Sequence, residues 1–367
     1  MRLDHLFLQD FRNYACLELD LSPGVNLIVG DNAQGKTNLL EAIGYLGSGK
    51  SFRAQKNSEL IGFQADHAEL SGSITAQQRS QSIRWLLFPG SRSRQLWRNG
   101  VKQKTAADIA GILPSVLFCP EDLMMLKTGA APRRKFGDLA LCQLRPNYDA
   151  ALTEYGRILE QKSRILKDHR ENPALLAILP EYNTRLCQVG ALLISYRARF
   201  YESMGKEAAA YHGQFSGGAE EFSLEYKTVS TVTDPFAPVD TLRGQLEDHL
   251  QSHYRAELES GQCLTGPHKD DFDLCLSGIS LKSYGSQGQT RTAAISLKLA
   301  QRALMAREFG EEPVLLLDDV LSELDPMRQD FVLNQIDRGQ VFITCCEPGR
   351  FTKLGKTIEI QKGKLKY

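Results

Sequence analysis

Residues 30–37 read Gly30-Asp31-Asn32-Ala33-Gln34-Gly35-Lys36-Thr37, a full match to the phosphate-binding pattern G-x-x-x-x-G-K-[ST]. The apolar run at residues 25–29 predicts a strand before this loop, and apolar residues at helical spacing up to Leu46 predict a helix after it. Backbone N–H groups in such a loop point at one anion, and the helix adds the positive end of its dipole. We expect Lys36 to reach the β- and γ-phosphates of a nucleotide and Thr37 to offer its hydroxyl to Mg²⁺.

An acidic pair stands far downstream, after a second apolar run. Val314-Leu315-Leu316-Leu317 leads into Asp318-Asp319, and an unbroken apolar run is typical of a parallel strand that is buried on both faces. Open α/β sheets bind ligands at the carboxyl ends of such strands. We therefore expect Asp318 to hold Mg²⁺, directly or through water, and Asp319 to polarise an attacking water. Gln34 is a further candidate for positioning that water or the metal ion.

A third motif, Ser286-Gln287-Gly288-Gln289, opens a stretch that is rich in good helix formers. Ser286 is a candidate helix N-cap, and Gly288 would let the backbone approach an anion closely. By itself the motif is weak, and it more often marks a capped helix that binds nothing. Because one triphosphate rarely needs two anion-binding helix starts in one chain, we expect these four residues to contact a nucleotide that is held by a second copy.

The order of these motifs, followed by Ser322-Glu323-Leu324-Asp325, resembles that of the ABC-type ATPase heads of the SMC class. More narrowly, the chain is similar to the RecF family of bacterial recombination mediators. The segments that carry this similarity span nearly the whole chain. They are Phe11-Arg12-Asn13-Tyr14, residues 30–41, Ser51-Phe52-Arg53, Pro120-Glu121-Asp122-Leu123, Gly266-Pro267-His268-Lys269-Asp270-Asp271 and residues 317–325.

The resemblance implies a weak, DNA-associated ATPase of recombinational repair and replication that uses ATP and Mg²⁺ and forms a homodimer when ATP binds. It implies that the dimer binds duplex DNA near single-strand gaps, acts with RecR and RecO to promote RecA loading, and releases DNA on hydrolysis. The implied location is the cytoplasm, in association with the nucleoid. Asp325 would couple the two sites of the dimer, and Arg12 and Asn13 would contact the phosphates or base of the nucleotide.

One element departs from the family pattern, which is usually G-x-P-x-x-R-R-x-F-[apolar]-D. The matching residues are Arg133, Arg134, Phe136 and Asp138. The departures are Thr128, Ala130 and Gly137. These departures mean that the backbone conformation at this element need not match that of the family, but they do not weaken the resemblance itself. Thr344 also stands where transporter-type ATPases have a switch histidine, as is usual in RecF-like chains.

The chain has 367 residues. This length and its composition predict a soluble cytosolic protein with one large or two smaller domains. No apolar run approaches the ~18 residues that span a membrane, and the N-terminus begins a strand rather than a signal peptide. None of the eight cysteines forms a C-x-x-C pair. We therefore expect reduced thiols, including those of Cys345-Cys346.

The formal net charge is zero, so total charge does not indicate nucleic-acid binding. Residues 71–107, however, contain seven basic residues and no acidic one, together with the hairpin-turn signal Asn99-Gly100. A basic hairpin would neutralise several DNA phosphates, and a solvated basic ribbon is an equal alternative from the sequence alone. The candidates for DNA contacts are Arg53, Lys56, Arg92, Arg94, Arg98, Lys102, Arg133 and Arg134.

Both phosphate-binding elements must belong to one head, although most of the chain separates them. Apolar periodicity predicts a helix at residues 147–169, a break at Asn172-Pro173 and a second long helix around residues 186–200, which together form an arm. The predicted fold class is α/β: an ABC-type P-loop ATPase head with an inserted, mainly helical arm or lid lobe. The predicted boundaries are 1–129 and 257–367 for the head and 130–256 for the lobe.

The rival classes would need features that the chain lacks. Another SMC-like chromosome or repair ATPase would have long heptad arms or a zinc-hook cysteine pair. A transporter subunit would carry Leu-Ser-Gly-Gly-Gln and a switch histidine, where this chain has Tyr284-Gly285-Ser286-Gln287-Gly288 and Thr344. A metabolic P-loop kinase would not use a second anion-binding helix start, and a purely structural DNA-binding protein would not need Asp319 beside Asp318. By resemblance His268, Lys269, Asp270 and Asp271 are functional residues, but their types indicate no particular chemistry. A turn before a strand at residues 272–276 is as good an interpretation as a functional role.

Overall fold

The computed structural model describes residues 1–54, 56–90, 93–336, 338–347 and 349–366. It divides into two compact units, Met1–Met124 with Ala294–Tyr367, and Met125–Ala293. We call the first unit the head and the second the lobe. The lobe is inserted into the head sequence and is mainly helical, so the predicted fold class is confirmed.

One sheet of the head is antiparallel, with the strand order β2-β1-β4-β5-β6-β7. Its strands are β1 (Arg2–Phe11), β2 (Tyr14–Asp20), β4 (Ala68–Ala76), β5 (Arg79–Leu87), β6 (Gln95–Arg98) and β7 (Val101–Gln103). Buried residues alternate with partly buried ones along β4 and with more exposed ones along the second half of β5, so one face of the sheet is buried and the other is more open to solvent. Asn99-Gly100 joins β6 to β7 with the positive φ angles that the predicted hairpin turn requires.

The second sheet of the head has the order β15-β14-β3-β13-β12-β8, and its strands from β14 to β8 run parallel. Its strands are β3 (Val25–Val29), β8 (Ser115–Phe118), β12 (Val314–Leu317), β13 (Val341–Cys345), β14 (Gly355–Gln361) and β15 (Lys364–Leu365). Every residue of β12 is buried, which confirms the predicted parallel strand. The phosphate loop and Asp318-Asp319 follow parallel strands and therefore lie at the same edge of the sheet.

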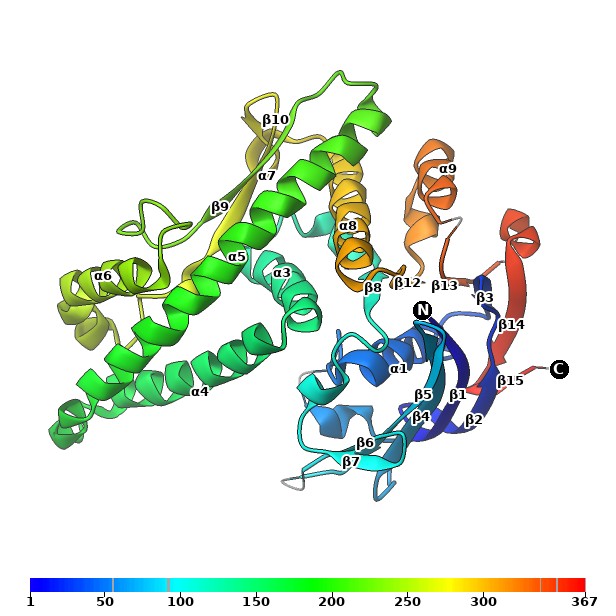
Figure 1. Ribbon diagram of the computed structural model, residues 1–367, viewed down its shortest axis with the longest axis horizontal. Coiled ribbons are helices and arrows are strands. Elements are labelled where there is room, and N and C mark those ends of the chain that lie inside the picture. The colour runs from blue at the N-terminus through cyan, green and yellow to red at the C-terminus, as the bar shows by residue number, and fades with distance from the viewer. Residues whose placement is uncertain (55, 91–92, 337, 348, 367) are drawn as a thin grey trace. The chain divides into compact units, whose positions relative to one another are not determined.

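Helix α1 (Lys36–Ser48) belongs to the core of the head (Figure 1). Leu39, Ile43 and Leu46 have no solvent exposure and share one apolar cluster with Leu70 of β4 and Leu316 of β12. Burial of a leucine or isoleucine side chain contributes roughly 1.5–3 kcal/mol, so α1 anchors the phosphate loop to both sheets. Shorter helical segments of the head are η1 (Asn57–Leu60), η2 (Ala106–Ile109), α2 (Pro120–Met124), η5 (Val320–Glu323), α9 (Pro326–Asn334) and η6 (Gly349–Lys353).

The predicted helical arm is present in the lobe (Figure 1). Helix α4 (Pro146–Asp168) and the longer α5 (Leu179–Ser216) are joined through η3 (Pro173–Ala177), where Asn172-Pro173 was expected to break the helix. The other elements of the lobe are α3 (Ala130–Leu144), β9 (Phe222–Lys227), α6 (Val239–Ser260), η4 (Pro267–Lys269), β10 (Asp271–Leu276), β11 (Ile279–Ser280) and α7 (Leu281–Tyr284). Helix α8 (Gln287–Phe309) begins in the lobe and ends in the head.

The lobe differs from the prediction in where it ends, because it continues to Ala293 instead of residue 256. Strand β10 pairs with β9, so the chain after Glu257 returns to the sheet of the lobe. Glu257 on α6 is itself fully buried and pairs with the equally buried Lys162 of α4 at 2.7 Å. Hydrophobic periodicity identifies strands but not their partners, and α6 was not predicted at all. The lobe also begins slightly earlier than expected, at Met125 rather than residue 130.

A buried ion-pair network holds the segment Pro267–Lys269 and the acidic residues after it. Arg197 of α5 donates to Asp138 of α3, to Asp270 and to the Pro267 carbonyl. Tyr226 of β9 also donates to Asp270. Burial raises the pKa of Asp270, and the charge of Arg197 opposes that shift. Of the two interpretations left open by the sequence, the structural one accounts for Asp270.

Arg133 is a structural residue, so its assignment as a DNA contact was wrong. Its side chain is 2% exposed and forms a bidentate pair with Asp271, with Nε–Oδ1 at 2.6 Å and Nη2–Oδ2 at 2.8 Å. It also donates to the carbonyls of Met125 and Thr128. The sequence could not separate this arginine from its neighbours, because its partner lies more than a hundred residues away.

Tyr201 occupies the space beside Gly137 that a side chain would fill. A Cβ at Gly137 would overlap the hydroxyl oxygen of Tyr201 and lie 2.8 Å from its Cζ. The Tyr201 hydroxyl donates to the Arg133 carbonyl at 3.3 Å and is thereby held in place. An apolar side chain at 137 therefore requires Tyr201 to be displaced.

We expect Gly137→Ala to lower the free energy of unfolding by about 1–3 kcal/mol, since overpacking displaces Tyr201. Urea denaturation measures this change. The same substitution should cost less in a Tyr201→Phe background, because the clashing hydroxyl is gone. Gly156→Ala on α4, where a Cβ meets no atom within 4 Å, is the matched control. Equal costs of Gly137→Ala in both backgrounds would contradict the pairing.

His268 is expected to make the lobe sensitive to acid. Its Nδ1 is 2.8 Å from the Tyr155 hydroxyl and its Nε2 is 3.0 Å from the Cys263 carbonyl, and burial lowers its pKa to about 4. An unfolded histidine has a pKa of about 6.5. The unfolded chain therefore binds more protons between these values, and stability falls as the pH drops from about 6.5 towards 4.

The measurement is the urea midpoint as a function of pH, for wild type and for His268→Gln. We expect the wild-type midpoint to fall over this window and the variant midpoint to fall less. His249, whose pKa is also lowered by burial, contributes equally to both proteins, so the difference isolates His268. Identical pH slopes would show that His268 is not the group responsible.

The eight cysteines are all free. Cys345 is buried at the end of β13, where burial raises the pKa of its thiol to about 11, and Cys346 after it is exposed. Within the part of the chain that the structure describes, no helix has the length and apolar character needed to cross a membrane.

Candidate nucleotide site

The phosphate loop closes around the side chain of its own lysine. Lys36, the first residue of α1, is 7% exposed and donates to the carbonyl oxygens of Gly30 at 2.6 Å and Asp31 at 3.0 Å. Strand β3 and helix α1 flank the loop, which confirms the predicted strand–loop–helix arrangement. The ammonium group is thus positioned to exchange these carbonyls for phosphate oxygens.

At two positions of the loop, neighbouring atoms leave no space for a side chain, so only glycine fits. A Cβ at Gly30 would overlap the Ile360 carbonyl oxygen, and one at Gly35 would lie 2.6 Å from Asn13 Nδ2. Gly35 also has a φ of +115°, which other residues rarely adopt. Asn13 donates to the Gln34 carbonyl at 3.0 Å and so braces the loop. The structure therefore places Asn13 at the site, and its contact with a nucleotide stays a prediction.

Thr37, Asp318 and Thr344 form a hydrogen-bonded triad that joins the loop to the acidic strand. Both threonine hydroxyls donate to Oδ1 of Asp318, from Thr37 at 2.9 Å and from Thr344 at 3.0 Å. The backbone N–H of Asp319 donates to Thr344 Oγ1 at 2.8 Å. The sequence predicts for Thr344 only that it replaces a switch histidine, whereas the structure shows that it hydrogen-bonds to both aspartates.

The two aspartates differ in environment. Asp318 is 7% exposed, and burial raises its pKa, while the two threonine hydrogen bonds lower it. Asp319 is less buried and has a left-handed backbone with φ of +52°. Non-glycine residues adopt this conformation rarely, and such strain is concentrated at functional sites. The left-handed backbone of Asp319 is therefore consistent with a functional role for this residue.

Arg53, predicted to contact DNA, lies beside the phosphate loop. Its Nη1 donates to Asn38 Oδ1 of α1 at 3.2 Å, and its positive charge lowers the pKa of Asp318. The side chain is exposed. An exposed guanidinium beside a phosphate loop is well suited to bind a phosphate, so we now associate Arg53 with the nucleotide.

Cys346 lies at the site, although no sequence motif indicates it. Its Sγ is 3.5 Å from Lys36 Nζ and 3.1 Å from Asn32 Oδ1. The parallel register of β13 and β3 places Cys345 opposite Val29, so the segments that follow both strands meet. The missing information was the strand order, which no local pattern contains.

Arg12 has protein partners that account for its charge. Its Nε and Nη2 each lie 2.9 Å from an oxygen of the fully buried Glu41 carboxylate, and its Nη1 donates to the Glu59 carbonyl at 2.6 Å. The pair ties the β1–β2 turn to α1. A contact between Arg12 and the nucleotide is left as a prediction without support from this geometry.

Gln34 and Asp325 are also engaged within the protein. The Gln34 side-chain carbonyl accepts from the Lys362 N–H at 2.5 Å, in the turn between β14 and β15. Asp325 caps α9 by accepting from the Arg328 N–H and pairs with the Arg328 side chain. These contacts explain why the residue types are required locally, and the predicted catalytic and coupling roles rest on the sequence alone.

The signature segment forms a capping box at the start of α8. Ser286 Oγ accepts from the Gln289 N–H at 3.2 Å, and Gln289 Oε1 accepts from the Ser286 N–H at 3.0 Å. The predicted N-cap is therefore confirmed. Gln289 Nε2 also donates to Glu220 at 2.7 Å, which lowers the pKa of Glu220. Ser286 and Gln287 are exposed at this helix start, where the dipole favours an anion.

The basic residues proposed for DNA contacts differ in their surroundings. Arg94 is partly buried, donates to the Tyr45 hydroxyl at 2.9 Å and lies over the Trp85 ring at 4.9 Å. This packing gives Arg94 a structural function within the head. It offers no support for a DNA contact.

Four further DNA candidates fall among the described residues outside the nucleotide site. Lys56 and Lys102 are exposed. Arg98 and Arg134 are partly exposed and donate to a glutamine side chain and to a backbone carbonyl, respectively. Arg92 lies outside the described residues.

A parallel sheet with a phosphate loop, an acidic strand and a capped signature helix defines an ATPase head of the ABC type. The family model "RecF/RecN/SMC N terminal domain" matches residues 2–366. The "DNA replication and repair protein RecF" of Symbiobacterium thermophilum is 38% identical over 349 residues, covering 95% of this chain and 92% of the relative. The protein of the same name from Listeria welshimeri is 37% identical over the whole length of both chains.

Solved structures agree with this. One described as "recombination mediator protein RecF-ATPrS in RecFOR pathway" has a TM-score of 0.91 at 32% identity, covering 99% of this chain and 97% of that chain. An Smc head domain from Pyrococcus furiosus, at 17% identity and a TM-score of 0.54, shares the fold alone. The chain belongs to the RecF/RecN/SMC family and, within it, to the RecF proteins of DNA replication and repair.

Alkylation of Cys346 with N-ethylmaleimide is expected to weaken ATP binding by about tenfold or more, because the adduct would occupy space beside the Lys36 ammonium. Binding of a fluorescent ATP analogue measures this. Cys346→Ser should bind the analogue normally and resist the reagent. Cys16→Ser, which removes the exposed cysteine of β2, should remain sensitive. Equal inactivation of Cys346→Ser would disprove the assignment.

Proposed function

We propose that two copies of this RecF-family ATPase bind MgATP in composite sites and, as a dimer, hold duplex DNA near single-strand gaps. The observation that supports this most is the hydrogen bond from Thr37 to Asp318, because it joins the phosphate loop and the acidic strand into one site. The exposed, capped start of α8 is a second anion-binding element. ATP hydrolysis is the reaction that such a combination of elements performs.

Each residue of the head site has a distinct role in this proposal. Lys36 gives up the carbonyls of the loop and binds the β- and γ-phosphates. Arg53 adds positive charge on the side of Asn38. Asp319, whose position is set by Thr344, orients the attacking water, and the buried surroundings of Asp318 strengthen electrostatic interactions at the site.

Thr37 and Asp318 also fit Mg²⁺. A hydroxyl and a carboxylate are hard oxygen ligands, and Mg²⁺ in nucleotide sites takes one or two of them together with water and phosphate oxygens. When bound, the ion neutralises charge on the phosphates. The two side chains lie 2.9 Å apart through their oxygens, so one ion could be held by both after the hydroxyl proton turns away.

The position of the signature residues at an exposed helix start supports the proposed dimer. Ser286 and Gly288 of one copy cap the γ-phosphate held by Lys36 of the other. Two nucleotides then join two chains, because each negative charge is matched only when both are present. Loss of the γ-phosphate on hydrolysis removes that match and opens the dimer.

The DNA role draws on the named relatives. Those relatives are called DNA replication and repair proteins, and solved ones are described with ATP in the RecFOR pathway. We infer the same function here, in the cytoplasm and at the nucleoid, with RecR and RecO as partners and RecA loading as the outcome. Contacts made mainly with phosphates would make DNA binding sensitive to salt.

The test is the molar mass by light scattering, with and without MgATP. Wild type should change from monomer to dimer only with MgATP, and Lys36→Met and Ser286→Arg should both remain monomeric. Ser203→Arg, at an exposed serine of α5, is the matched control and should dimerise. A wild type that stays monomeric while it hydrolyses ATP would contradict the proposed dimer.

Mixing the two inactive variants sharpens the test. In a mixed dimer, one site combines the intact Lys36 of the Ser286→Arg chain with the intact Ser286 of the Lys36→Met chain. The mixture should therefore regain part of the ATPase activity that neither variant has alone. If wild type is active and the mixture is not, the signature does not act across two copies.

A further inference from the structure

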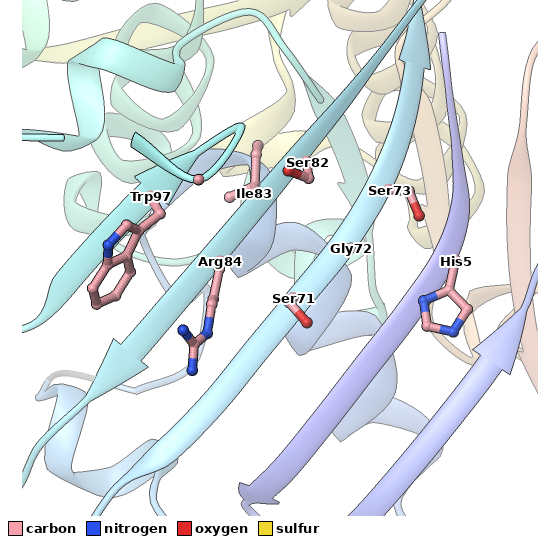
Figure 2. A pocket seen from close by; sticks show the side chains of 9 residues that line it. His5, Ser71, Gly72, Ser73, Ser82, Ile83, Arg84 and Trp97 are labelled. Atoms are coloured by element: carbon pink, nitrogen blue, oxygen red, sulfur yellow. The ribbon is translucent and has the colours of Figure 1, made fainter. Parts of the chain in front are cut away.

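The solvated face of the antiparallel sheet carries a hollow of about 410 Å³. Figure 2 shows its lining on neighbouring strands, with His5 on β1, Ser71 and Ser73 on β4, Arg84 on β5 and Trp97 on β6. The hollow lies within the head. None of its lining residues belongs to the phosphate loop, the acidic strand or the signature segment.

The hollow exists because short side chains occupy the middle of the sheet. Ser73 pairs with Ser82 across β4 and β5, and Ser71 pairs with Arg84. Among the residues that the structure describes, the three serine hydroxyls have no hydrogen-bond partner, so the floor offers free donors and acceptors. At one end of the hollow, His5 approaches Glu18 of β2 at 3.1 Å.

Trp97 stands between two cations. The Cζ atom of Arg84 lies 5.4 Å and the Nζ atom of Lys102 lies 5.7 Å from its ring centroid, which is within cation–π range. A bidentate pair with Glu69, at 2.7 and 2.8 Å, orients the Arg84 guanidinium. Lys102 lies opposite Trp97 on β7 and has no acidic partner in the described part of the chain.

We propose that this face binds single-stranded DNA, with a base stacked on Trp97 in the hollow and a phosphate at Lys102, while Glu69 holds Arg84 beside the ring. An aromatic platform beside cations is the chemistry by which proteins bind single strands, since every base has a π-face. The serine hydroxyls complete the surface for sugar and phosphate oxygens. This proposal rests on the proposed DNA function, and it gives the single-stranded side of a gap its own surface.

A duplex does not satisfy the same surface. Its bases stack on one another and reach a protein ring only when they are flipped out, which costs energy. A single strand exposes its bases without that cost. Lys102 is exposed and has no acidic partner among the described residues, so its charge beside the ring is available to a phosphate.

The test measures fluorescence anisotropy of a labelled oligothymidine and of a duplex of equal length, with the full chain and MgATP. Trp97→Ala should weaken oligothymidine binding by about tenfold or more, and Trp97→Phe should retain most of it. Duplex binding and ATP-dependent dimerisation should match wild type. Phe63→Ala, at a fully exposed aromatic residue of the head, is the matched control and should bind both DNAs normally.

Two further readouts depend on the chemistry of the surface. Trp85, the second of the two tryptophans, is 1% exposed, so quenching of the protein fluorescence by oligothymidine reports on Trp97. Lys102→Gln should reduce the slope of log affinity against log salt by about one, as expected for the loss of one phosphate contact.

Unchanged oligothymidine affinity in Trp97→Ala would overturn the proposal. Binding of a polyglutamate peptide, lost in Trp97→Ala, without oligothymidine binding would overturn it in favour of an acidic protein segment. In both cases duplex binding by wild type would leave the proposed function intact. A wild type that binds neither DNA with MgATP would overturn both.

Discussion

The Asp318 carboxylate is the point on which the nucleotide site depends. It is almost fully buried, and a buried charge is costly unless it is compensated. The Thr37 and Thr344 hydroxyls provide that compensation, one from the phosphate loop and one from the neighbouring strand β13. The same bonds hold the loop against the sheet and set the amide of Asp319. The hydrogen bonds that stabilise the fold at Asp318 are therefore also the ones that position the side chains of the nucleotide site.

Local patterns predicted the parts of the fold that are determined locally. Helix α1 and strand β12 follow from apolar spacing, and the break between α4 and α5 follows from Asn172-Pro173. The end of the lobe does not, because the pairing of β9 with β10 and the ion pair of Lys162 with Glu257 join segments that are distant in sequence. Thr344 and Cys346 were missed for the same reason, since only the order of the strands brings them to the phosphate loop.

Residue type alone was a poor guide to the function of the arginines. Arg133 is buried against Asp271, Arg94 packs on Trp85, and Arg53 lies beside the phosphate loop. The residue type does not say whether the partner of an arginine is another residue, a nucleotide, DNA or only water. The signature helix shows the opposite case, because its capping box could be predicted from the serine and glutamine in its own first turn.

The left-handed backbone of Asp319 has a consequence for sequence variation. Glycine, asparagine and aspartate tolerate this conformation, whereas β-branched and bulky residues do not. Most substitutions of Asp319 would therefore strain the backbone in addition to removing the carboxylate. Asparagine alone keeps the side-chain shape and tolerates the left-handed backbone while it removes the negative charge. Naturally occurring variants of this family that bind nucleotide but no longer turn it over should carry asparagine here far more often than chance would give.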